Sequence, residues 1–242
     1  MSKGSRSSRF YYLAGAWAGI TAGTLVVRAA KRATNRKREK DVLAAGGLVP
    51  EASNVVAALA RRAADRASAS RTALVAADGK TEWSWSAYYD SVRAFGAALI
   101  SVGGSSGGGG GAAGIAVHAF NCPEWFFAAL GAMHAGWTVS GIYTTNTYDQ
   151  AAHILRTSAV KVLVLESKEQ LSQTYGKLLE EFPAVVAVLL RGGDNDPTSR
   201  TPSYAAFLER GENVASALPS ADDLSPQRVT SLVCKSCEDL SI

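Results

Sequence analysis

The sequence predicts an α/β fold, a mostly parallel sheet with covering helices, preceded by an N-terminal hydrophobic helix. Strand-length apolar runs alternate with helix-length segments between residues 115 and 190, the pattern typical of a parallel sheet covered by helices. The runs 161–165 and 184–190 are mostly apolar without alternation, as expected of strands buried on both faces. Of the 242 residues, 47% are hydrophobic and 19% are charged, so the chain can bury a full core.

The N-terminal region carries an uncharged segment at residues 10–27, which follows a basic tail at residues 1–9. As a helix, this segment would be about 27 Å long, close to the hydrocarbon thickness of a bilayer. Seven Lys and Arg residues follow within 28–50, the basic linker, and they predict a cytosolic C-terminal side. We therefore expect a membrane anchor. Gly15, Gly19 and Gly23 share one face of that helix and predict self-association.

Two other interpretations of the N-terminus stay open. Residues 1–38 are basic, contain serine and lack acids, which is also typical of a transit peptide to a mitochondrion or plastid. A cleaved secretory signal is the second, although the basic run after the apolar segment counts against it. If the apolar segment binds a membrane, the basic residues 28–40 would add attraction to anionic lipid.

The positive net charge of +4 belongs to the N-terminal region alone. Residues 1–40 hold ten Lys and Arg against one acid, Glu39, which leaves 15 Lys and Arg against 20 Asp and Glu in the rest. The folded part is therefore mildly acidic. A nucleic-acid-binding domain would carry its basic patch on the fold, so nucleic acid is excluded as the expected partner.

The first elements of the folded part are a helix, a hairpin and a second helix. Residues 53–69 form an Ala- and Arg-rich helical segment, and residues 73–77 a strand that turns at Asp78-Gly79 into a second strand at 81–83. Ser84 can cap the next helix, whose apolar residues recur at three- and four-residue steps up to Leu99. The glycine-rich segment 103–114 that follows has no lysine and comes before a strand, so we interpret it as a linker and not a nucleotide loop.

A β-strand, a helix and a second strand at residues 115–143 form the centre of the predicted domain. The start of the helix has Asn121 as a capping side chain, Pro123 and the acid Glu124. Gly136 ends it. Further along, Thr147 caps a helix to Arg156, residues 167–181 are helical, and residues 204–210 and 228–233 form a short helix and a last strand.

This central stretch resembles a known family. The run NCPEWFF at residues 121–127, the pair Ala135 and Gly136, and the run GIYTTN at residues 141–146 are similar to the N-terminal part of the adenylate-forming, AMP-binding acyl-CoA synthetases, most closely the long-chain, bubblegum-type branch. The resemblance extends from about Trp83 to Val233. It implies that residues 51–233 are an incomplete N-terminal portion of the large domain of an adenylate-forming enzyme.

The resemblance implies ATP-dependent formation of an acyl-adenylate and then of acyl-CoA, with ATP, Mg and CoA as cofactors of the family and fatty acid as substrate. In relatives, a Thr-Ser-Gly-Thr-Thr-Gly loop that contacts ATP follows the strand that matches residues 230–233. Here the sequence reads CKSCEDLSI at residues 234–242, a tail foreign to the family. We expect a truncated ligase that is inactive alone and holds no cofactor. A non-catalytic, membrane-tethered module that binds acyl chains or a partner is the alternative.

The sequence assigns no catalytic or metal-binding residue. Tyr143, Thr144, Thr145 and Asn146 are the candidate substrate-binding residues, because they follow a parallel strand at the edge where α/β sheets place ligand crevices; a turn with a helix cap is the other interpretation. The three histidines, His118, His134 and His153, have no partner at readable spacing and are expected to be packed or solvated. The CxxC of Cys234 and Cys237 has no second pair to complete a zinc site.

Overall fold

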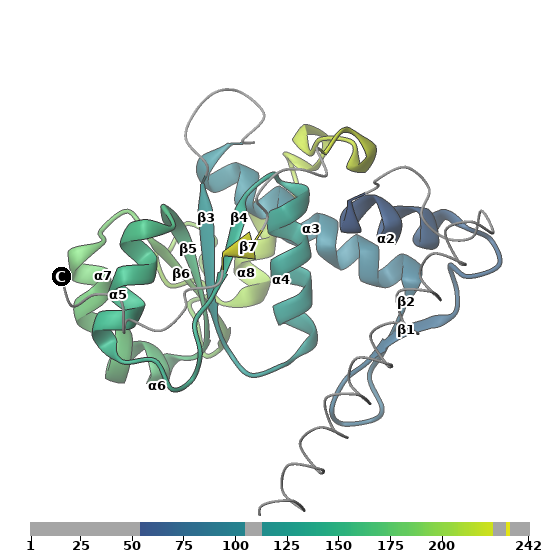
Figure 1. Cartoon of the computed structure of the whole chain (residues 1–242). Coiled ribbons are helices and arrows are strands. Elements are labelled where there is room, and N and C mark those ends of the chain that lie inside the picture. The colour runs from purple at the N-terminus through teal and green to yellow at the C-terminus, as the bar shows by residue number, and fades with distance from the viewer. Residues whose placement is uncertain (1–53, 105–112, 225–230, 233–242) are drawn as a thin grey trace, which may run out of the picture. The chain divides into compact units, whose positions relative to one another are not determined.

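Five parallel strands form the main sheet, in the order β6-β5-β3-β4-β7 (Figure 1). The structure is a computed structural model that describes residues 54–104, 113–224 and 231–232. The strands are β3 (Gly114–His118), β4 (Thr138–Gly141), β5 (Val160–Ser167), β6 (Val186–Arg191) and β7 (Ser231–Leu232). The predicted α/β class and parallel sheet are confirmed. Of the predicted last strand, 228–233, the structure describes two residues.

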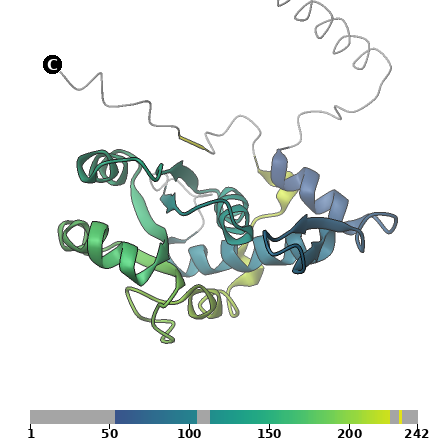
Figure 2. The ribbon, with the colours of Figure 1, turned by 90° about the horizontal axis from the view of Figure 1, so that it is seen from below.

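Helices cover both faces of this sheet (Figures 1 and 2). One face packs against α3 (Trp85–Gly103), α4 (Pro123–His134) and α8 (Tyr204–Glu209), with Ile115 and Val117 of β3 in the same buried cluster as Phe95 and Phe207. The other face packs against α5 (Tyr148–Thr157) and α7 (Gly176–Glu181). Because β3 alternates between the two clusters, its residues are buried on both sides.

The predicted strand, helix and strand at residues 115–143 are confirmed as the parallel unit β3-α4-β4. The strands are shorter than predicted. Gly136 ends the helix segment with φ of +76°, a conformation that favours glycine. Trp137, which is 1% exposed, then donates from Nε1 to the carbonyl of Gly104 at 3.0 Å. This bond ties the start of β4 to the end of α3.

The N-terminal helix and hairpin also form, with changed boundaries. The helix α2 spans Val55–Ala64 and is capped by Asn54, so it is shorter than the predicted 53–69. The same Asn54 side chain donates to the carbonyls of Ala221 and Leu224 at 2.8 and 3.0 Å, near the short turn η3 (Ala221–Asp223). Strands β1 (Thr72–Val75) and β2 (Glu82–Ser84) are antiparallel.

Local capping signals account for most helix starts. Ser84 accepts from the amide of Ala87 at the start of α3, and Thr147 caps α5, both as predicted. Gln150 completes a capping box with Thr147. The predicted helix 167–181 is interrupted. It divides into α6 (Lys168–Gln170), a π-helical turn η1 (Leu171–Tyr175) and α7; Tyr175 is fully buried at the end of that turn.

Several predictions lie outside the described residues and stay predictions. They concern the anchor at 10–27 with Gly15, Gly19 and Gly23, the centre of the glycine-rich segment, and Cys234 and Cys237. Within the described part of the chain, no helix has the length and apolar character that crossing a membrane requires.

Candidate functional site

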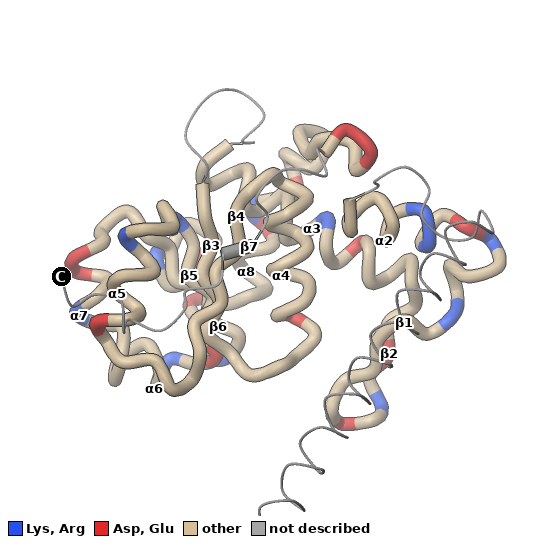
Figure 3. Tube along the Cα trace, in the orientation of Figure 1, with Lys and Arg blue, Asp and Glu red and all other residues tan. Residues whose placement is uncertain are grey.

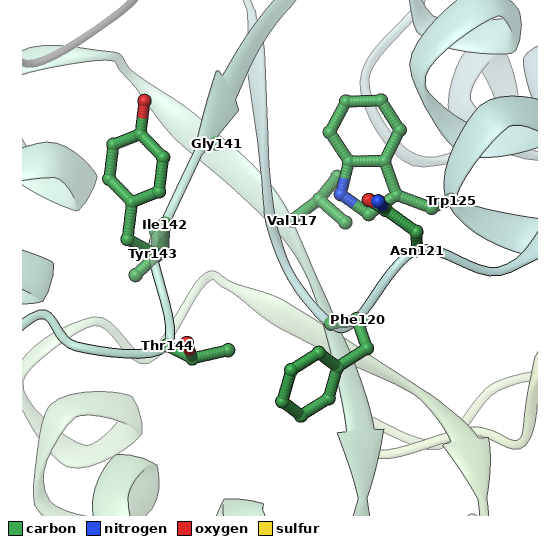
Figure 4. A pocket seen from close by; sticks show the side chains of 9 residues that line it. Val117, Phe120, Asn121, Trp125, Gly141, Ile142, Tyr143 and Thr144 are labelled. Atoms are coloured by element: carbon green, nitrogen blue, oxygen red, sulfur yellow. The ribbon is translucent and has the colours of Figure 1, made fainter.

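A pocket of about 410 Å³ opens where β3 and β4 end at the carboxyl edge of the sheet (Figure 4). Nine residues from the segments that leave the two strands line it: Val117, Ala119, Phe120, Asn121, Trp125, Gly141, Ile142, Tyr143 and Thr144. The amide of Ile142 donates to the carbonyl of Val117 at 2.9 Å, so the two segments stay joined for one residue beyond β4. They separate after it, and the pocket lies between them.

The connections of the sheet explain why a crevice forms here. β3 leads to α4 on one face, whereas its neighbour β4 leads to α5 on the opposite face, because β5 lies on the far side of β3. The strand order reverses between β3 and β5, because β3 leads to β4 on one side and β5 leads to β6 on the other. Such a reversal is the topological switch point, outside which open α/β sheets bind their ligands, and the pocket between β3 and β4 lies next to it. The pocket therefore lies at the carboxyl edge of the sheet, beside the point where ligands are expected.

The pocket wall is aromatic and unusually exposed. Phe120 is 68% exposed and Tyr143 is 62% exposed, and in Figure 4 Tyr143 lies across the opening from Asn121 and Trp125. Large exposed aromatic side chains in a concave site are typical of binding surfaces. Asn121 and Thr144 supply the polar groups of the wall. The arrangement suits an apolar or planar group with a few hydrogen bonds.

Two of the four predicted substrate-binding residues, Tyr143 and Thr144, line this pocket. Thr145 and Asn146 do not; the amide of Asn146 donates to the carbonyl of Tyr143 at 2.9 Å and closes a turn before the cap at Thr147. The structure thus contains both the turn and the crevice, which the sequence analysis gave as alternative interpretations of residues 143–146. Substrate binding by these residues stays a prediction.

The sequence analysis did not predict that Phe120, Asn121 and Trp125 line the pocket. The prediction that Asn121 caps α4 is wrong. Cys122 occupies the N-cap position without a side-chain hydrogen bond, and Pro123 begins the helix, so Asn121 lies one residue too early to reach the first turn. It lines the pocket instead. The signal that could have found Phe120 and Asn121 was the same as for Tyr143, their place directly after a buried strand. Trp125 lies in the first turn of α4.

A second, more polar pocket of about 270 Å³ adjoins the first along the same edge and shares Ala119, Phe120 and Asn121 with it. Arg191 and Glu166 form an ion pair of 2.5 Å within it. Cys122 also lines this pocket, but burial raises the pKa of its thiol to about 11. The thiol is therefore protonated at neutral pH and unsuited to nucleophilic chemistry.

The histidines His118 and His134 are packed side chains, as predicted. His118 is 6% exposed and its Nδ1 lies 2.5 Å from the Tyr175 hydroxyl, while Nε2 of His134 donates to the carbonyl of Pro219 at 3.1 Å. Neither lines the pocket at β3 and β4. His153 on α5 is half-buried and does not line it either.

Burial of His118 makes the stability of the domain pH-dependent. Desolvation lowers the pKa of His118 from its ordinary 6.5, so between that lowered pKa and pH 6.5 the unfolded chain binds more protons at this side chain than the folded chain does. We expect the free energy of unfolding to fall as the pH drops below about 6.5, by up to about 1.4 kcal/mol per pH unit from this group. Urea unfolding between pH 5 and 7.5 measures the slope.

The variant His118→Gln should reduce that slope, and His153→Gln removes a histidine elsewhere as the control. An unchanged slope in His118→Gln would show that burial of His118 does not govern the pH dependence.

The fold and the pocket together define an α/β domain with a candidate ligand crevice at the carboxyl edge of its parallel sheet. The model of the family described as AMP-binding enzyme matches residues 60–226, and the chain belongs to this family. The resemblance found in the sequence is thereby confirmed.

Within this family, the chain is similar to long-chain-fatty-acid–CoA ligases. The chain is 30% identical over 141 residues to the long-chain-fatty-acid–CoA ligase heimdall of Drosophila melanogaster. The aligned residues cover 58% of this chain and 20% of that protein. It is 31% identical over 148 residues to the long-chain-fatty-acid–CoA ligase ACSBG2 of Rattus norvegicus, and that alignment covers 59% of this chain and 21% of that protein. The chain thus spans about a fifth of the length of these relatives.

Solved structures share the fold. The anthranilate CoA ligase AuaEII in complex with anthranoyl-AMP has a TM-score of 0.60 at 19% identity, over 76% of this chain and 32% of that one. A benzoate CoA ligase from Burkholderia xenovorans LB400 has a TM-score of 0.51 at 19% identity, over 70% and 29%.

Proposed function

We propose that this chain carries the first part of the large domain of a long-chain-fatty-acid–CoA ligase, and that the pocket between β3 and β4 forms one wall of its substrate crevice. The observation that carries the proposal is the pocket at the carboxyl edge of the sheet, next to its switch point, in a chain that belongs to the AMP-binding enzymes. The names of the relatives supply the reaction, the joining of a long-chain fatty acid to CoA, and the family resemblance implies that the reaction uses ATP.

The described residues supply a crevice wall and not the whole of the chemistry. In residues 54–104, 113–224 and 231–232, no three His, Cys, Asp or Glu side chains come together to hold a metal ion. The Mg that the family uses is therefore not assigned to them. The 242 residues also contain no Thr-Ser-Gly-Thr-Thr-Gly loop for the ATP phosphates, so we assign them no ATP contact.

We expect the purified 242-residue chain alone to form no acyl-CoA from ATP, palmitate and CoA, because the phosphate-binding loop is missing from its residues. Release of AMP and formation of the thioester are the measurements, with the heimdall ligase as the positive control. Measurable ATP-dependent turnover by the chain alone would contradict this part of the proposal.

The positive test is a chimera in which residues 60–226 of this chain, which match the family model, replace the corresponding part of the heimdall ligase. If the chain carries a ligase crevice, the chimera joins palmitate to CoA. A chimera that folds cooperatively in urea and yet forms no thioester would refute the proposed role of the crevice.

A further inference from the structure

A separate apolar groove of about 370 Å³ lies among α2, α3 and α4. Its walls come from the outer face of α2, the first turn of α3 and one residue of α4: Val55, Ala58, Leu59, Arg62, Trp85, Tyr88 and Leu130. None of these residues lines the two pockets at the carboxyl edge of the sheet. The groove is therefore a distinct site that the proposed ligase crevice does not use.

The spacing of residues on α2 creates the groove. Val55, Ala58 and Arg62 recur at three- and four-residue steps and so share one helix face. A different face, with Val56 and Ala57, is buried against the turn η3 and the partly buried Tyr89 and Met133. The first face is left open, since Val55 is 53% exposed. Helix α2 thus presents a second apolar face.

The groove carries one charge at its rim. Arg62 is the only charged residue of the lining, and its guanidinium carbon lies 5.7 Å from the centre of the Trp85 ring. Within the described part of the chain, Arg62 forms no ion pair, whereas its neighbour Arg61 pairs with Asp222 at 3.4 Å. Figure 3 shows this basic end of α2.

We propose that the groove binds a single-chain amphiphile with an anionic head, a long-chain carboxylate. Its hydrocarbon chain lies against Trp85, Tyr88 and Leu130, and its carboxylate meets the guanidinium of Arg62. Apolar walls with one cation at the rim, which forms no ion pair among the described residues, match this ligand in both apolar surface and charge. At about 370 Å³, the groove takes part of a chain and leaves the remainder outside.

The test is calorimetric titration of the 242-residue chain with dodecanoate, without ATP or CoA. We expect saturable binding that dodecylammonium does not reproduce. Ala58→Trp should fill the groove and weaken binding at least about tenfold. Ala64→Trp, an exposed residue of the same helix outside the groove, is its control.

The role of the Arg62 charge is tested by the same calorimetric titration. Arg62→Gln should weaken binding about fivefold, in the range of an exposed ion pair, and Arg62→Lys should restore most of it. Arg66→Gln, an exposed arginine outside the groove, should leave the affinity unchanged. Urea unfolding of each variant shows whether the fold is intact.

The proposal would be overturned by no saturable binding, by equal binding of dodecylammonium, or by parental affinity in a folded Ala58→Trp variant. Loss of binding in Gly141→Trp would also overturn it, because that substitution fills the pocket between β3 and β4 instead. Binding to anionic vesicles in place of free dodecanoate would assign the face to a membrane surface. Since no ligation is measured, failure here is independent of failure of the ligase proposal.

Discussion

Replacing Gly141 by tryptophan in the chimera with the heimdall ligase is expected to lower kcat/KM for acyl-CoA formation by about 100-fold or more. Gly141 lies at the end of β4 and lines the pocket. No heavy atom lies within 4 Å of the position that a Cβ would take there. The indole therefore fills the pocket without disturbing the fold, and displacement of a substrate by as little as about 1 Å costs a rate factor of this order.

The control for this substitution is Lys177→Trp. Lys177 is an exposed residue of α7 and does not line the pocket, so its tryptophan variant should keep the parental kcat/KM. Gly141→Ala should keep it as well, since a methyl group leaves the pocket open. Parental activity in Gly141→Trp would show that no substrate occupies the space between β3 and β4.

The substitution Trp137→Ala is expected to lower the free energy of unfolding by about 3–5 kcal/mol. Trp137 is among the largest fully buried side chains and belongs to the core on the α3 and α4 side of the sheet. Its loss leaves a cavity at the start of β4 and removes the hydrogen bond to Gly104. Urea unfolding of the 242-residue chain measures the change.

Trp137→Phe separates the two contributions. Phenylalanine keeps most of the buried volume and loses the bond from Nε1, so we expect a loss of about 1–2 kcal/mol. A loss below about 1 kcal/mol in Trp137→Ala would mean that the contact between β4 and α3 does not stabilise the domain.

The fold could be predicted from the sequence where the signal is local. Apolar runs located the strands, and side chains that cap their own helix, such as Ser84 and Thr147, located helix starts. Features that depend on the exact position of one residue were harder to predict. A shift of one residue separated the predicted cap Asn121 from the actual N-cap Cys122, and no local pattern indicated the π-helical turn before Tyr175.

The site was only half predictable because it depends on strand order. The sequence showed that Tyr143 and Thr144 follow a strand, and nothing local showed that β5 pairs with β3 on the side away from β4. That pairing sends α4 and α5 to opposite faces and brings Phe120, Asn121 and Trp125 to the same crevice. Non-local pairing is the information that periodicity lacks.

The most direct test of the proposed crevice is the kcat/KM of the unsubstituted chimera for palmitate, ATP and CoA. We predict ATP-dependent thioester formation that depends on an open position at Gly141. A chimera that unfolds cooperatively like the heimdall ligase but forms no acyl-adenylate and no acyl-CoA would contradict the assignment of these strands to a ligase crevice.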